Sequence, residues 1–438
     1  MIIVDTALER RQAEGNPVRV AMVGAGYIGR GVTLQIEKYI KGMALVAISN
    51  RTPTKAKQAY QEAEIDSITR VKTVAQLEEA IAKGQRAITD DPILLCEASG
   101  IDVIIEATGT IEFSAHMVIK ALKNRKHVVL MNAELDATIG PILKVYADRA
   151  GVIITNADGD QPGVMMNLLR FVRTIGYEPV LAGNIKGIQD HYRTPETQKA
   201  YAARFGLTPE MATSFADGTK ISMENAVVAN ATGFKVGKRG MYGPRCDHVS
   251  EAVSLFPLDQ LLNGGLVDYI LGAEPSPGVF VLGYNEHPIR QHYMNHFKMG
   301  PGPLYVFYLP YHFPHLEVPL TAARAVLFQD AAVAPLADPV CDVIAIAKRD
   351  LKAGEVIDGI GGFTCYGMIE NFEVCQAEDL LPMGLSEGCC LKRDILRDQT
   401  IAYTDVEVPP GRLCDKLRAE QDAYFTHHRI HETLHFLD

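Results

Sequence analysis

Three glycines near the start of the chain have the spacing of a dinucleotide-binding turn. They follow an apolar run at 18–23 and precede a helical pattern over residues 30–39. The first glycine permits a tight turn, the second lets the backbone approach a pyrophosphate, and the third lets helix pack on strand. Backbone N–H groups at the helix N-terminus would bind the phosphates. The motif therefore predicts a bound nicotinamide dinucleotide and hydride transfer. We expect the cofactor to be bound by Gly24, Gly26, Tyr27, Ile28 and Gly29.

The end of the second predicted strand sets the choice of cofactor. Proteins that bind NAD usually carry Asp or Glu there, for the ribose hydroxyls. This chain has Asn50 and Arg51 after the apolar run at 43–48. No carboxylate would repel a 2′-phosphate, and Arg51 can pair with that phosphate and stack on adenine. We therefore expect NADPH; the alternative is that Arg51 is an ordinary surface charge.

Two later apolar runs also end in polar residues. Thr108 follows the run at 102–106, and Asn132 and Glu134 follow the run at 127–131. Doubly wound sheets bind ligands at the carboxyl ends of their strands. We expect Thr108 and Asn132 to contact the cofactor and Glu134 to have a catalytic role. A helix cap is the alternative for the last two.

A pair of carboxylates follows the next predicted strand. Asp158 and Asp160 lie in the loop that follows the predicted strand at 152–155. Carboxylate oxygens suit hard divalent ions, so the pair predicts a site for Mg²⁺ or Mn²⁺ in which Asp160 is also catalytic. Glu224 is a third candidate ligand. A turn in which an aspartate caps the following helix fits the spacing equally well.

Cationic residues beyond residue 180 are candidates for binding an anion. Lys186 lies between glycines at the end of a predicted strand that leads to Arg193, and Lys220 and Asn225 lie on a predicted helix. A net charge of −10 gives the chain no general attraction for anions. A local site for a phosphate or a developing oxyanion follows, with Lys186 catalytic and the other three residues binding substrate. Exposed lysines, or a surface pair of Lys220 with Glu224, are the alternative.

The order of elements predicts an α/β fold. Strands alternate with helices to about residue 155, which is typical of a doubly wound Rossmann domain. Longer segments follow, with strands expected at 278–282 and 304–309, and they indicate an α+β catalytic domain. Short strands, tight turns and a helical tail come last. We expect an NADP-binding domain at 1–155, a catalytic and dimerisation domain at 156–340, and a small β-rich domain at 341–438.

Composition excludes several classes of protein. Hydrophobic residues make up 47% and charged residues 22% of the 438 residues, as in ordinary globular proteins. The acidic balance argues against a nucleic-acid partner, and no apolar run is long enough for a membrane span. The start of the chain lacks a secretory signal, and the eight cysteines include no CxxC pair. We expect a cytoplasmic protein with reduced cysteines.

Longer stretches resemble known families. TGTIEFSAHMVIKALKNRKHVVLMNAELDATIG resembles homoserine dehydrogenase, and with GAGYIG this resemblance covers roughly the first 190 residues. The pattern AKRDLKAGEVI, LPMGL, KRDI and TDVEV, between residues 345 and 408, resembles a SAF domain, which is a small β-clip module. The chain is similar to the reductoisomerase-like enzymes that act on 1-deoxy-D-xylulose 5-phosphate. Those enzymes combine the same two kinds of domain, and the stretch NADGDQPGVMMNLLR also resembles theirs.

The resemblance implies a reaction and a set of site residues. A retro-aldol and re-aldol step would rearrange the phosphosugar, and NADPH would reduce the aldehyde to 2-C-methyl-D-erythritol 4-phosphate for isoprenoid synthesis. Ordinary reductoisomerases carry Asn-Lys-Glu and a metal-binding Asp-Xaa-Glu, which match residues 132–134 and 158–160 here. Ala133 replaces the lysine, whose role we assign to Lys186. Fosmidomycin, a phosphonate hydroxamate, is an expected inhibitor.

Two other functions fit the same residues. One is a homoserine-dehydrogenase-like oxidoreductase that acts on another small hydroxy or semialdehyde substrate. The other is a non-catalytic protein that senses NADP, with the SAF-like domain holding a ligand or partner. Related homoserine dehydrogenases pair through the sheet of the substrate domain, so the resemblance also implies a homodimer.

Overall fold

The chain folds into two compact units, each built from separate stretches of sequence. The computed structural model describes residues 3–435, with side chains described as far as residue 426. Unit 1 holds Met1–Asp160, Phe313–Ala334 and Lys416–Asp438. Unit 2 holds Gln161–His312 and Pro335–Asp415. The three domains expected from the sequence are contiguous, whereas these units are not.

Unit 1 is built around a parallel sheet of seven strands in the order β3-β4-β2-β1-β5-β6-β7. The strand order reverses at β1, which pairs with both β2 and β5, and this confirms the predicted doubly wound sheet. The ends of β1 and β5 are therefore where such a sheet binds its ligand. The strands are β1 (Val18–Val23), β2 (Met43–Ser49), β3 (Ile68–Arg70), β4 (Arg86–Thr89), β5 (Val103–Glu106), β6 (His127–Leu130) and β7 (Ile154–Asn156).

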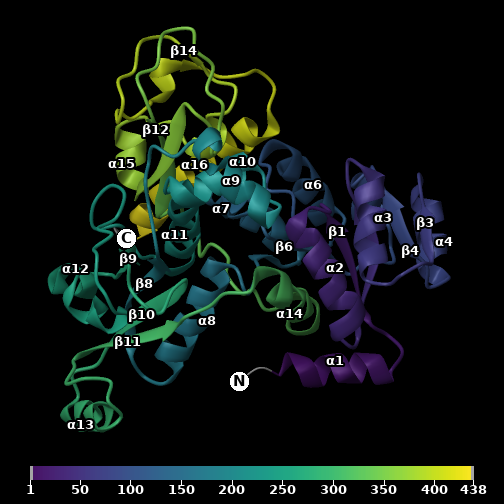
Figure 1. The fold of residues 1–438 in the computed structure, drawn as a ribbon, viewed down its shortest axis with the longest axis horizontal. Helices are drawn as coiled ribbons and strands as arrows, with labels where there is room; N and C mark the ends of the chain where they lie inside the picture. Colours follow the sequence, from purple (N-terminus) through teal and green to yellow (C-terminus); the bar gives the residue numbers. More distant parts are fainter. Residues whose placement is uncertain (1–2, 436–438) are drawn as a thin grey trace. The chain divides into compact units, whose positions relative to one another are not determined.

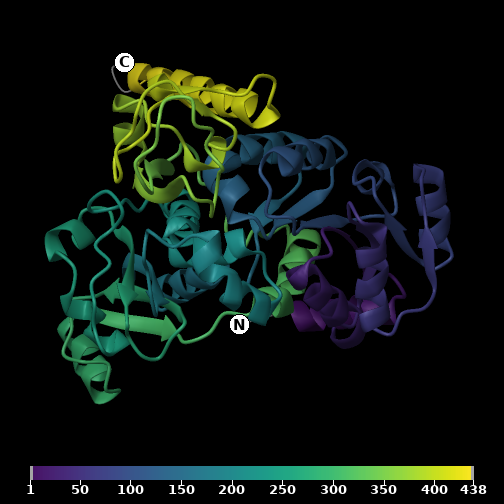
Figure 2. The ribbon, with the colours of Figure 1, turned by 45° about the horizontal axis from the view of Figure 1, so that its top comes forward.

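A late segment completes the core of unit 1. Helix α14 (Pro314–Phe328) lies beside α2 (Tyr27–Tyr39) in Figures 1 and 2. Its Val318 and Ala322 are buried in one apolar cluster with Val32 of α2. The other helices of this unit are α1 (Val4–Ala13), α3 (Pro53–Glu62), α4 (Val74–Ala82), α5 (Ile93–Glu97), α6 (Glu112–Lys123) and α7 (Ala133–Ala150). Helix α16 (Leu413–His435) begins in unit 2 and continues into unit 1.

Unit 2 contains a second sheet, with strands in the order β11-β10-β8-β9. Strand β10 is antiparallel to both β8 and β11, while β8 and β9 are parallel. The strands are β8 (Glu178–Lys186), β9 (Leu266–Leu271), β10 (Gly278–Tyr284) and β11 (Leu304–Leu309), so both strands expected here are confirmed. The helices are α8 (Gln161–Thr174), α9 (Pro195–Phe205), α10 (Pro209–Ala216), α11 (Thr219–Thr232), α12 (Leu258–Leu262), α13 (Pro288–His296) and the 3₁₀ helix η1 (Val249–Ser254).

The last part of unit 2, residues 341–407, consists of short strands and turns and is called the C-terminal β segment below. It packs on α11, where the backbone N–H of Gly367 donates to the hydroxyl of Thr219 at 2.8 Å. It therefore belongs to the same compact unit as the sheet above. Its elements are β12 (Cys341–Ala347), β13 (Cys365–Asn371), β14 (Cys390–Leu391), β15 (Val406–Glu407), α15 (Phe372–Ala377), η2 (Met383–Leu385) and η3 (Tyr403–Asp405).

None of the described helices is both long enough and apolar enough to cross a membrane.

Candidate functional site

The glycine turn leaves room for a ligand at one of its three glycines. Gly24 has a φ of +108°, and a Cβ there would lie 2.6 Å from the carbonyl oxygen of Ala107. A Cβ on Gly29 would lie 2.5 Å from the carbonyl oxygen of Gly24. Gly26, which caps α2, has no atom within 4 Å of a Cβ built on it. The fold itself requires the outer glycines, whereas Gly26 keeps a space open at a helix N-terminus, as a pyrophosphate needs.

Asn50 shapes this turn from the end of β2. Its Oδ1 accepts a hydrogen bond from the backbone N–H of Ala25 at 3.0 Å, and its Nδ2 donates to the carbonyl of Thr52 at 2.9 Å. Arg51 beside it is exposed, and no contact of its guanidinium with a described residue is recorded. Asn50 thus holds the turn in place, and its contact with the cofactor stays a prediction, while Arg51 has its charge available for a ligand.

The ends of β5 and β6 carry a buried polar cluster that includes a carboxyl group not predicted from the sequence. Glu106 is the last residue of β5 and is fully buried; its Oε1 accepts from the backbone N–H of Thr108 at 2.8 Å. Its Oε2 has no hydrogen-bond partner among the described residues, and burial raises its pKa. Asn132 caps α7 by accepting from the backbone N–H of Leu135 at 3.0 Å. The helix-cap interpretation of Asn132 is therefore confirmed, and its contact with the cofactor stays a prediction.

The first turn of α7 holds a second buried carboxyl. Asp136 is 3% exposed, and the side-chain amide of Asn156 at the end of β7 donates to it. Burial raises the pKa of Asp136 to about 7. Glu134 precedes it on the same turn and is also buried. The sequence suggested a cap near Asp136 but not this titration near neutral pH.

We expect Asp136→Asn to change how stability depends on pH. The pKa of this carboxyl is about 7 in the native state and near the ordinary aspartate value of 3.8 in the unfolded chain, so the native state binds more protons between those values. The free energy of unfolding of the wild type should therefore fall as pH rises through this window, and stay low above it. At pH 8 the variant should be more stable by about 1–2 kcal/mol, and thermal unfolding from pH 5 to 8 measures this.

The exposed Asp148 of the same helix forms an ion pair with Lys144 and provides the control. Asp148→Asn should leave the shape of the stability curve unchanged. A curve of Asp136→Asn that is parallel to that of the wild type would contradict the prediction.

Asp158 is paired with an arginine from α14. Both of its carboxylate oxygens accept from Nη1 of Arg324, at 2.8 and 3.0 Å, and the hydroxyl of Thr321 donates to Oδ2 at 3.0 Å. Arg324 also binds Asp330 at 2.6 Å. The carboxylate of Asp158 thus holds α14 within unit 1, through partners that lie more than 160 positions later in the chain.

The residues present do not fit the predicted metal site. Among the side chains that the structure describes, no group of three or more His, Cys, Asp or Glu residues is arranged to hold a metal ion. Asp158 already has a cation against both oxygens. We therefore derive no chemical step through a metal.

A network of buried amides and a carboxylate lies between β8 and α11 in unit 2. Nδ2 of Asn184 donates to Oε1 of Gln161 at 2.6 Å and to Oε2 of Glu224 at 3.2 Å. Asn225 donates to Oδ1 of Asn184 at 2.7 Å. Oδ1 of Asn225 is buried and has no partner among the described residues. Two predicted site residues, Glu224 and Asn225, thus both contact Asn184, which sequence reasoning missed.

Lys186 extends this network toward the end of β8. It lies two residues after Asn184, so both side chains emerge from the same face of the strand. Lys186 is half-buried, and no contact of its ammonium with a described residue is recorded. Lys220 lies one turn before Glu224 on α11 and is also half-buried. The end of β8 therefore presents an available positive charge beside buried polar groups.

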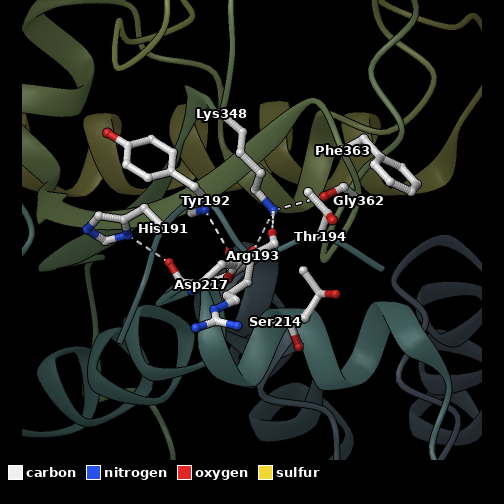
Figure 3. Close-up of polar contacts among 12 residues, drawn as sticks. His191, Tyr192, Arg193, Thr194, Ser214, Asp217, Lys348, Gly362 and Phe363 are labelled. Carbon is white, nitrogen blue, oxygen red and sulfur yellow. Dashed lines mark hydrogen bonds and ion pairs between the residues drawn. The ribbon is translucent and has the colours of Figure 1, made fainter. Parts of the chain in front are cut away.

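The loop after β8 is fastened at several points (Figure 3). Nε of Arg193 donates to Oδ2 of Asp190 at 3.0 Å. Nδ1 of His191 contacts the carbonyl oxygen of Asp217 at 2.7 Å. The His191 ring also stacks on the ring of Tyr366, with the ring centroids 4.5 Å apart. Arg193 is therefore held in the loop that follows Lys186, as the sequence suggested.

Two surface hollows of unit 2 lie elsewhere. A hollow of about 600 Å³ is lined by Glu178 and Tyr284, and one of about 380 Å³ by Glu178 and Phe234. Glu178 begins β8, whereas Lys186 ends it. Neither hollow is lined by Asn184 or Lys186, so both lie away from the polar network described above.

Comparisons with protein families cover most of both units. Residues 24–154 match the NAD binding domain of homoserine dehydrogenase, and residues 159–318 match the family described as oxidoreductase DRL, catalytic domain. The chain carries the two domains of a nicotinamide-dependent oxidoreductase. The matched segments of this oxidoreductase include the glycine turn, the polar ends of β5 and β6, and the network around Asn184.

Solved structures resemble the oxidoreductase only distantly, and no curated protein sequence matches it. A probable dehydrogenase from Thermotoga maritima is 14% identical with a TM-score of 0.44, over 73% of this chain and 91% of that one. A Staphylococcus aureus homoserine dehydrogenase is 19% identical with a TM-score of 0.28, over 49% of each chain. An Agrobacterium radiobacter oxidoreductase, solved with NAD⁺, L-tartaric acid and magnesium, is 16% identical with a TM-score of 0.28, over 40% and 45%. These similarities are too weak to indicate an activity for this chain.

Proposed function

We propose that the protein is an NADPH-dependent reductoisomerase that converts 1-deoxy-D-xylulose 5-phosphate to 2-C-methyl-D-erythritol 4-phosphate. The observation that carries this proposal is the ammonium group of Lys186, at the end of β8 beside the buried network of Asn184. Within the described part of the chain, it makes no hydrogen bond or ion pair with another side chain. An acidic chain gains little from such a cation except as a local site for an anion. The matches to two oxidoreductase domains support the redox part of the proposal.

Each group of residues has a distinct task in this proposal. The glycine turn and Arg51 bind NADPH, which supplies a hydride when bound. Lys186 donates to the carbonyl oxygen that becomes negative during reduction, and provides its proton. Arg193 binds the phosphate, so that binding energy far from the reacting carbon positions the substrate. Glu224 and Asn225 bind substrate hydroxyls from their fixed places on α11.

The experiment that tests the proposal is a substrate screen read by NADPH oxidation. We expect turnover with 1-deoxy-D-xylulose 5-phosphate, formation of 2-C-methyl-D-erythritol 4-phosphate, and inhibition by fosmidomycin. Oxidation only with unphosphorylated semialdehydes would replace the proposal by a homoserine-dehydrogenase-like activity. NADPH binding without turnover of any phosphosugar or semialdehyde would favour a protein that senses the nucleotide.

Arg51 is expected to set the preference for NADPH over NADH. Its guanidinium makes no hydrogen bond or ion pair with a described residue, and Arg51→Ala would remove a charge-assisted contact with the 2′-phosphate. We expect the Kd for NADPH to rise by about tenfold while the Kd for NADH stays unchanged, so the preference for NADPH falls by the same factor. Fluorescence titration with both nucleotides measures both constants. Equal affinity for NADH and NADPH in the wild type would contradict the prediction.

A further inference from the structure

The C-terminal β segment contributes one fully buried ammonium group to the rest of unit 2. Lys348 follows β12, and its side chain is 2% exposed, while that of Asp217 is 0% exposed. Its Nζ donates to Oδ2 of Asp217 at 2.9 Å, and to the carbonyl oxygens of Arg193 and Gly362 at 2.8 Å each. Figure 3 shows these acceptors converging on the nitrogen. All three donors of the ammonium are therefore used.

Two of these acceptors belong to segments that carry residues of the candidate site. Arg193 lies in the loop that follows Lys186 at the end of β8. Oδ1 of Asp217 accepts from the backbone N–H of Thr219, the first residue of α11, at 2.9 Å. Helix α11 carries Glu224, so one ammonium group joins the start of that helix to the loop of Arg193.

A buried ion pair of this kind fixes geometry more than it adds stability. Removing two charges from water is costly, and an apolar pair of similar size often stabilises a fold as well. What an apolar pair does not supply is a set of directed hydrogen bonds to chosen backbone carbonyls. The bond to Arg193 holds its backbone, and in Figure 3 its guanidinium points away from Lys348.

We propose that Lys348 is a positioning residue that makes the C-terminal β segment part of the substrate site. It fixes the loop of Arg193 against the start of α11, so that Arg193 and Glu224 meet the substrate in one geometry. The effect on catalysis rests on the proposed function, whereas the effect on the loop does not. Lys348 itself touches neither substrate nor cofactor in this proposal.

The experiment compares Lys348→Met with Lys352→Met. Lys352 lies on the same segment, its side chain is 73% exposed, and it pairs with Asp394, so it controls for the substitution. We expect amide hydrogen exchange of residues 190–194 and 217–220 to become about tenfold faster in Lys348→Met only. With 1-deoxy-D-xylulose 5-phosphate, KM should rise by about tenfold while kcat changes little. The Kd for NADPH should not change.

A second variant keeps the test decisive if Lys348→Met folds poorly. Lys348→Met with Asp217→Asn leaves no buried charge and retains an oxygen to cap Thr219, so it should unfold near the wild-type temperature. Unchanged exchange of residues 190–194 in a folded variant would overturn the proposal. If wild type turns over no phosphosugar, the proposed function fails, and the exchange data still decide the role of Lys348.

Discussion

Lys186→Met should lower kcat/KM for 1-deoxy-D-xylulose 5-phosphate by about ten- to a hundredfold. The variant loses a charge-assisted hydrogen bond of about 1.5–3 kcal/mol to the oxygen on which negative charge develops. That charge appears only as the hydride arrives, so kcat should fall while KM stays within about threefold. Steady-state kinetics at saturating NADPH separate the two constants. The Kd for NADPH should be unchanged, because the glycine turn lies in unit 1.

Two further variants control this prediction. Lys199 lies on α9 with a side chain that is 71% exposed, so Lys199→Met should leave both constants unchanged. Lys186→Arg keeps the charge and should recover part of kcat. If Lys186→Met raises KM and leaves kcat intact, Lys186 binds the substrate phosphate instead of the reacting oxygen. If Lys186→Met has the kcat and KM of the wild type, Lys186 is not part of the substrate site.

Gly26→Ala should weaken NADPH binding by about ten- to a hundredfold without destabilising the free protein. The added methyl group meets no protein atom within 4 Å, and the φ of −77° is ordinary for alanine. The methyl group enters the space through which a pyrophosphate approaches the backbone. It thereby weakens or removes charged hydrogen bonds that contribute about 1.5–3 kcal/mol in total. Fluorescence titration gives the Kd, and thermal unfolding without nucleotide gives the stability.

Gly24→Ala provides the contrast within the same turn. Its methyl group would lie 2.6 Å from the carbonyl oxygen of Ala107, and alanine is strained at a φ of +108°. This variant should unfold at a lower temperature even without nucleotide. If Gly26→Ala binds NADPH with the wild-type Kd, the turn does not receive the pyrophosphate.

Local sequence signals were sufficient for the doubly wound pattern of unit 1, although β3, β4 and the late helix α14 were not predicted. An apolar run, a glycine turn and a helix recur in order, and parallel strands joined by helices have few arrangements. The polar ends of the strands were also visible, since Asn132 directly follows one apolar run and Asp158 lies shortly after another. Which of them are buried or paired was not visible. Glu106 ends a strand in the sequence as plainly as any of these, and this signal was overlooked.

The contacts that sequence patterns missed join residues far apart in the chain. Arg324 neutralises Asp158 from 166 positions away, and Lys348 reaches Asp217 across 131 positions. Neither pair has a periodic or spaced signature, because a salt bridge depends on where the fold brings two elements together. A carboxylate therefore looks the same in the sequence whether it is available to a metal or already paired with an arginine.

The division of unit 1 into separate stretches has a consequence for synthesis on the ribosome. All seven strands of its sheet are made by residue 156, but Val318, Ala322 and Ala323 join its apolar core only after α14 has been translated. Until then the face of α2 that receives them lacks its cover, while the whole sheet of unit 2 is being made. We expect the nascent chain to remain a substrate for chaperones during this interval, since exposed apolar surface drives misassembly of large proteins. A fragment that ends at residue 160 would retain that uncovered face permanently.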